Sequence, residues 1–98
     1  MTPFADKAFV PSNAVLAEPL ETGLALTRVG GDRVFVLNVT GATIWQLFDG
    51  HTTCHQIASV LAQRFTMPIE QLEQEVRGFI ARLAAAGLIK EQDTDHNN

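Results

Sequence analysis

The stretch VFVLNVTGATIWQLFDGHTTCHQIASVLAQRF, residues 34–65, decides the fold of this chain. It joins a short apolar strand, which we expect to end at Leu37, to two helices. The first helix is predicted over residues 39–48, and the second begins after Thr53, which forms a T-x-x-Q capping-box pattern with Gln56. No residue in the stretch is equipped for bond-making chemistry. We therefore expect it to build a strand edge beside a helical core.

Upstream of this stretch, the pattern predicts two more strands, over residues 14–18 and 24–29. Gly30-Gly31-Asp32 is a hairpin signal, because glycine supplies the positive φ that tight turns need. The strand after the turn, residues 33–37, is rich in β-branched and aromatic side chains. Together these segments predict a three-stranded antiparallel sheet.

Downstream, a third helix is predicted to begin near Pro68 and to end at Gly87. Leu88 and Ile89 are expected to return to the core. The apolar residues of this helix recur at three- and four-residue spacing: Ile69, Leu72, Val76, Phe79, Ile80 and Leu83.

The order of elements predicts an α+β, winged-helix-like fold in which a three-stranded antiparallel sheet is followed by a three-helix bundle. We expect one domain over residues 13–90. Residues 1–12 are predicted to be an N-terminal arm, whose docking the sequence leaves open, and residues 91–98 a flexible polar tail.

Composition limits the classes of partner. The 98 residues fit one soluble domain, and neither a signal peptide nor a membrane span is evident, so we expect a cytoplasmic protein. One cysteine excludes an internal disulfide framework. Seven Lys and Arg against eleven Asp and Glu, a formal net charge of -4, make nucleic acid a poor partner.

His51, Cys54 and His55 lie close enough in sequence to raise the question of a metal or catalytic site. Zinc sites normally need four ligands, and the remaining histidine, His96, lies in the predicted tail. Cys54 and His55 are neighbours on a helix, so they point in different directions and form no catalytic pair. We expect no metal, no cofactor and no enzyme activity.

The predicted strand edge from Arg33 through Val34, Phe35, Val36 and Leu37 offers a site of another kind. An unpaired edge presents backbone N–H and C=O groups to an incoming strand. Between Val34 and Leu37 the edge carries neither charge nor proline, the usual protections. Three interpretations remain open: a binding surface, a strand-swapped homodimer, or a strand that is not outermost.

One flank of the third helix is the second candidate surface. Glu73, Arg77, Ile80 and Ala84 share it on a helical wheel, and they mix charge with apolar and small side chains. Such a flank is either a wall of a peptide groove or a solvated helix border. Gly78, on the outer face of the same helix, costs about 1 kcal/mol relative to alanine, and the sequence offers no reason for it.

The spaced pattern of these segments resembles the PqqD family, named for pyrroloquinoline quinone (PQQ) biosynthesis. The resemblance covers residues 14–90. It rests on Val36-Leu37-Asn38, Gly41-Ala42, Ile44-Trp45, Asp49-Gly50, Thr53, Ile57, Leu61, Phe79, Leu83 and Gly87-Leu88-Ile89.

The resemblance implies a recognition element for ribosomally synthesised and post-translationally modified peptides (RiPPs). Such an adaptor holds the leader of a precursor peptide as a fourth strand and presents it to a modifying enzyme, often a radical S-adenosylmethionine (radical SAM) protein. Mapped here, the strand edge is Val34 to Leu37 and the helical wall is Glu73, Arg77, Ile80 and Ala84, with Arg77 able to pair with an acidic leader residue. The alternative from another class is a winged-helix DNA-binding transcription regulator, which the acidic charge disfavours.

Overall fold

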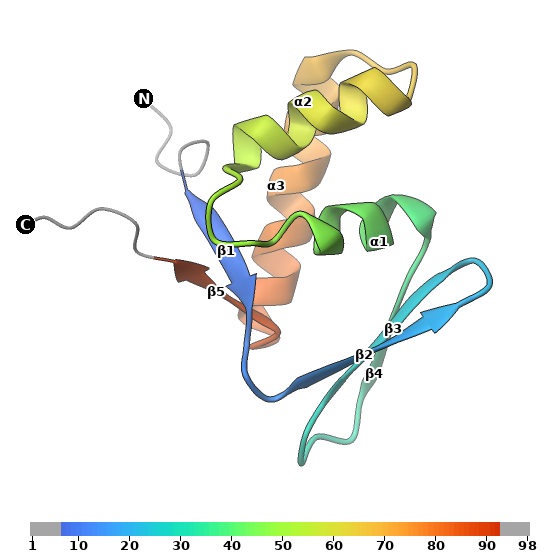
Figure 1. Cartoon of the computed structure of the whole chain (residues 1–98), viewed down its shortest axis with the longest axis vertical. Coiled ribbons are helices and arrows are strands. Elements are labelled where there is room, and N and C mark those ends of the chain that lie inside the picture. Colours follow the sequence, from blue (N-terminus) through green and yellow to red (C-terminus); the bar gives the residue numbers. More distant parts are fainter. Residues whose placement is uncertain (1–6, 93–98) are drawn as a thin grey trace, which may run out of the picture.

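The computed structural model describes residues 7–92, which form three helices and five strands (Figure 1). The three-stranded sheet lies at one end of the molecule, and the helices stack beside it around α3. Along the chain the elements are β1 (Ala8–Pro11), β2 (Val15–Leu20), β3 (Gly23–Arg28), β4 (Val34–Leu37), α1 (Val39–Gln46), α2 (Cys54–Arg64), α3 (Ile69–Ala85) and β5 (Ile89–Gln92).

The larger sheet is an antiparallel meander in the order β2-β3-β4. Its register pairs Leu24 with Leu37 and Leu26 with Phe35, so these four side chains share the face turned toward the helices. Leu24, Leu26 and Leu37 are buried on that face. The predicted α+β fold, with a three-stranded antiparallel sheet followed by three helices, is confirmed.

Local hydrogen bonds define where the helices begin. Asn38 caps α1 by accepting a hydrogen bond from the N–H of Gly41 at 2.9 Å. At α2 the predicted capping box is present: Thr53 accepts from the N–H of Gln56, and the Gln56 side chain accepts from the N–H of Thr53. Pro68 is the N-cap of α3 and makes no side-chain capping bond.

A second sheet, the antiparallel pair β1-β5, was not predicted from the sequence. Ala8–Pro11 pairs with Ile89–Gln92, so paired strands extend past both predicted domain boundaries. This pairing forms because the N-terminal segment is buried against the rest of the protein. Phe9 is only 5% exposed and meets Phe48 edge to face at 6.4 Å, which holds β1 against the helices. The rest of the predicted arm and tail, residues 1–6 and 93–98, lies outside the described residues.

One hydrophobic core joins all three helices to β3, β4 and the β1-β5 pair. Leu88 and Ile89 belong to it, as predicted. Between residues 7 and 92 no helix is long and apolar enough to cross a membrane. The largest side chains that are almost completely buried are Leu26, Ile57, Leu61, Leu72, Val76, Ile80 and Leu88.

Candidate functional site: a groove between a strand edge and a helix

β4 is an edge strand of the sheet. It pairs with β3 on one side, and within residues 7–92 no strand pairs with its other side. Leu37 is buried toward the helices, whereas Val34 and Val36 point to the opposite face and are 63% and 69% exposed. The backbone N–H and C=O groups along the free side of β4 are therefore available to another strand.

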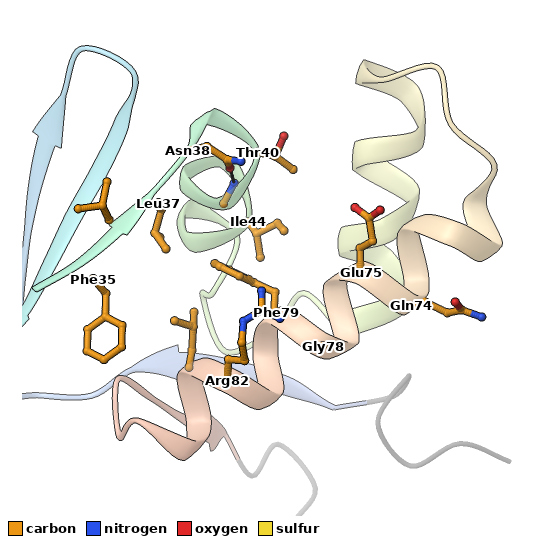
Figure 2. Close-up of a pocket in the computed structure, with 13 residues that line it drawn as sticks. Phe35, Leu37, Asn38, Thr40, Ile44, Gln74, Glu75, Gly78, Phe79 and Arg82 are labelled. Atoms are coloured by element: carbon orange, nitrogen blue, oxygen red, sulfur yellow. Dashed lines mark hydrogen bonds between the residues drawn. The ribbon is translucent and has the colours of Figure 1, made fainter.

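The free side of β4 forms one wall of an open groove of about 610 Å³, and α3 forms the other wall (Figure 2). α1 and its N-cap Asn38 contribute the remaining surface. The lining is Phe35, Val36, Leu37, Asn38, Thr40, Gly41, Ile44, Gln74, Glu75, Gly78, Phe79, Arg82 and Leu83.

Two glycines shape this groove in opposite ways. Gly41 brings the walls together: a Cβ on it would lie 3.1 Å from the Cβ of Leu37 and 3.3 Å from Cζ of Phe79. Gly78 leaves the surface of α3 open toward the groove, because no side chain projects from it. A Cβ there would have one neighbour within 4 Å, Nη1 of Arg82 at 3.8 Å. The helix glycine that the sequence did not explain thus faces the open groove.

The groove has opposite charges at its two ends. Toward the C-terminal end of α3 the guanidinium of Arg82 lies 6.0 Å from the centre of the Phe79 ring. The guanidinium of Arg33, which is not among the lining residues, lies 5.7 Å from the centre of the Phe35 ring. Neither arginine forms an ion pair with another residue between 7 and 92. At the other end Glu75 has only a long contact, 3.5 Å, from the side-chain amide of Gln71.

The predicted strand residues lie where the sequence placed them. Residues 34–37 form the edge, and Arg33 immediately precedes it. Three of the four, Phe35, Val36 and Leu37, line the groove. The open interpretation of β4 as an inner strand is excluded for the described part of the chain, because β3 is the central strand.

The predicted helical residues lie elsewhere: none of the four lines the groove. Glu73 forms an ion pair with His55 of α2, and Arg77 lies near Cys54 at the start of the same helix. Ile80 is fully buried in the core. Ala84 is exposed but outside the groove. Glu73 and Arg77 therefore lie on the flank of α3 that faces α2.

The residues missed by the sequence reasoning are on the opposite flank of α3: Gln74, Glu75, Gly78, Phe79, Arg82 and Leu83. Gly78 was the available signal, because a glycine inside an amphipathic helix needs a packing or functional reason. At the start of α1, where the sequence predicted only the beginning of a helix, Thr40 and Gly41 also line the groove.

Cys54 is the first residue of α2, and His51 and His55 lie on either side of it in the chain. Cys54 is 3% exposed, and burial raises the pKa of its thiol, an effect that the nearby positive charge of Arg77 partly opposes. His55 is held by Glu73. The backbone N–H of His51 donates to Asp49, whose side chain closes the turn after α1. Across residues 7–92 no three His, Cys, Asp or Glu side chains gather in a cluster that could hold a metal ion.

Comparison with known proteins agrees with this architecture. Residues 23–89 match the protein family described as coenzyme PQQ synthesis protein D, PqqD. The chain belongs to the PqqD family. The matched segment begins at β3 and ends in β5, so it contains every residue that lines the groove.

Two solved structures share the fold of this PqqD-family chain. One, TbiB1 in complex with the TbiA(beta) leader peptide, has a TM-score of 0.74 and 19% identity over 90% of this chain and 99% of its own. The other, lasso peptide synthetase B1 complexed with the leader peptide, has a TM-score of 0.76 and 22% identity over 84% and 96%. Comparison with curated protein sequences gives no significant match.

Proposed function

We propose that this PqqD-family chain is a peptide-binding adaptor of RiPP biosynthesis. It binds the leader of a ribosomally synthesised precursor by strand addition to β4 and presents the peptide to a modifying enzyme, of the radical SAM type or another. The observation that carries the proposal is the groove: a free strand edge faces a helix flank across an apolar floor.

The two walls supply two kinds of interaction. Backbone groups of β4 give affinity that tolerates many sequences, because every peptide has the same main chain. Side chains that point into the groove contact Phe35, Leu37 and Phe79, which select apolar residues at alternate positions of the bound strand. A winged-helix DNA-binding role receives no support from the comparisons, and the acidic net charge opposes it.

The adaptor role needs no catalytic group in this chain. The groove contains no thiol or imidazole, and the single cysteine is buried between α2 and α3. We assign the bond-making step to the partner enzyme. The solved structures support the peptide half of the proposal, since both are complexes with leader peptides.

The test is a titration of the isotopically labelled full chain with synthetic peptides that cover each short reading frame beside its gene, followed by backbone amide shifts. We expect one peptide to shift the amides of residues 34–37 and 74–83. Amides of residues 54–64 in α2 are the internal control. Binding whose shifts are confined to α2 or the β1-β5 pair, or no binding by any of the peptides, would contradict the proposal.

A further inference from the structure

We propose that Arg82 determines which peptides the groove accepts, by pairing with an acidic side chain located two residues C-terminal to an apolar side chain that faces Gly78. This inference rests on the peptide-binding function proposed above and adds a sequence requirement to it. From the sequence we expected Arg77 to pair with an acidic residue of the leader. In the structure Arg77 lies near Cys54 of α2, whereas Arg82 lines the groove.

Charge is the first argument. Arg82 lines the groove one turn C-terminal to Gly78, Arg33 lies beside Phe35, and neither arginine has a carboxylate partner within residues 7–92. Acidic residues outnumber basic ones in this chain, eleven to seven, so the guanidinium of Arg82 gives this part of the groove a charge opposite in sign to that of the whole chain. Glu75 at the opposite end repels a second acidic side chain there. An acidic side chain is therefore favoured at one end of the groove only.

Spacing is the second argument. Gly78 and Arg82 are one helical turn apart on the same flank, roughly 5–6 Å along the axis of α3. Side chains on one face of an extended strand recur every second residue, roughly 6.6 Å apart. A strand beside α3 can therefore present one side chain to Gly78 and the next one on the same face to Arg82. The position facing Gly78 has room for a bulky group, because α3 contributes no side chain there.

The direction of the bound strand follows from how β4 and α3 run. Gly41, just after β4, approaches Phe79 in the middle of α3. At the other end, Gly87 lies against Arg28, whose neighbour Thr27 pairs with Val34. β4 and α3 therefore run in opposite directions along the groove, as Figure 2 also shows.

An added strand is more stable when it pairs antiparallel, so we place it antiparallel to β4 and hence parallel to α3. Its chain then passes Gly78 before it reaches Arg82. The expected pattern is an apolar residue, any residue, and then Asp or Glu. A parallel strand would reverse this order.

The test uses the full chain and a phage-displayed library of random peptides of about ten residues, long enough for a strand of ordinary length. Selections are run on the wild type, on Arg82→Glu and on Arg64→Glu. The last variant is the matched control, since it changes net charge equally but lies at the exposed end of α2, outside the groove. Circular dichroism checks that each variant is folded, and Arg82→Gln replaces Arg82→Glu if the reversal disturbs folding.

We expect the wild type and Arg64→Glu to enrich the apolar-x-acidic pattern. Arg82→Glu should replace the acid by Lys or Arg at the same position, and Arg82→Gln should lose the preference. For one synthetic peptide pair that differs by Glu or Lys there, we expect about fivefold tighter binding of the Glu form to the wild type at low salt, decreasing as salt rises.

Each contrary result has a distinct meaning. If peptides are enriched but Arg82→Glu selects the same acids as the wild type, Arg82 does not read the peptide and the inference fails while peptide binding stands. If the acid precedes the apolar residue, the proposed strand direction is wrong. If the wild type enriches no peptide, the proposed function fails and the inference fails with it.

Discussion

The groove gives Gly78 two opposite roles, one in folding and one in binding, and substitution separates them. Gly78→Ala should stabilise the protein, because alanine is more favourable than glycine inside a helix by about 0.8–1 kcal/mol. No steric cost opposes this gain, since the nearest atom that the new Cβ meets is Nη1 of Arg82, at 3.8 Å. For a domain of this size, that stabilisation raises the melting temperature by about 5 °C.

Gly78→Leu should keep most of that stabilisation and lose peptide binding. Leucine has a helix propensity close to that of alanine, so α3 still gains. Its side chain, however, occupies the space in which the peptide would bury an apolar group. Burial of one such group is worth about 1.5–3 kcal/mol, so affinity should decrease roughly 10- to 100-fold.

Ala84→Leu is the matched control, because it places the same side chain on an exposed position of α3 outside the groove. Thermal denaturation and a fluorescence-anisotropy titration with a labelled peptide, chosen by the amide-shift experiment, measure both properties. If Gly78→Leu bound the labelled peptide with the affinity of the wild type, the groove would not be the binding site. A melting temperature of Gly78→Ala below that of the wild type would contradict the conclusion that the space beside this residue is open.

Three further predictions concern the scaffold of the groove. Cys54 should react slowly with a thiol reagent in buffer and rapidly in denaturant, because it is buried and its pKa is raised; rapid reaction of the native protein would contradict this. Gly23→Ala should cost about 3 kcal/mol of unfolding free energy, measured by urea denaturation, because a Cβ there overlaps the carbonyl oxygen of Leu37; a cost near zero would mean that β4 moves freely. Asp49→Ala should destabilise at neutral pH, with a loss that diminishes as the pH falls below 3.8 in thermal scans. Hydrogen bonds from the backbone of His51 and Thr52 lower the Asp49 pKa, so its stabilising contribution disappears on protonation, and a pH-independent loss would contradict this.

The strand half of the site was predictable because its signals are local. A glycine-rich turn precedes residues 34–37, β-branched and aromatic side chains fill the strand, and Asn38 begins a helix directly after it. Three consecutive antiparallel strands favour an edge position for the last of them, and the strand order of the structure gives β4 that position. The β1-β5 pair lacked such signals, because its strands are four residues each and lie at opposite ends of the chain.

The helical half was not predictable from periodicity. The buried stripe of α3, which includes Leu72, Val76 and Leu83, is bordered by two flanks of mixed composition. Periodicity identifies the stripe but does not tell which flank faces α2 and which faces the sheet. That choice depends on how the connection between α2 and α3 directs the helix, a tertiary property. Charged residues near the stripe led us to predict the flank that faces α2, where Glu73 contacts His55 between the helices.

The three glycines near β4 explain why the groove stays open in a well-packed protein. Gly23 permits a contact with the backbone of Leu37 that a Cβ would prevent, and Gly41 permits a contact with the Leu37 side chain that a Cβ would crowd, so both glycines pack closely against β4. Gly78 lies across the groove, where a larger side chain would meet almost nothing. Packing therefore accounts for the first two glycines and cannot account for the third. We attribute a glycine that costs the helix about 1 kcal/mol at this position to the proposed binding of a peptide, which requires an open surface there.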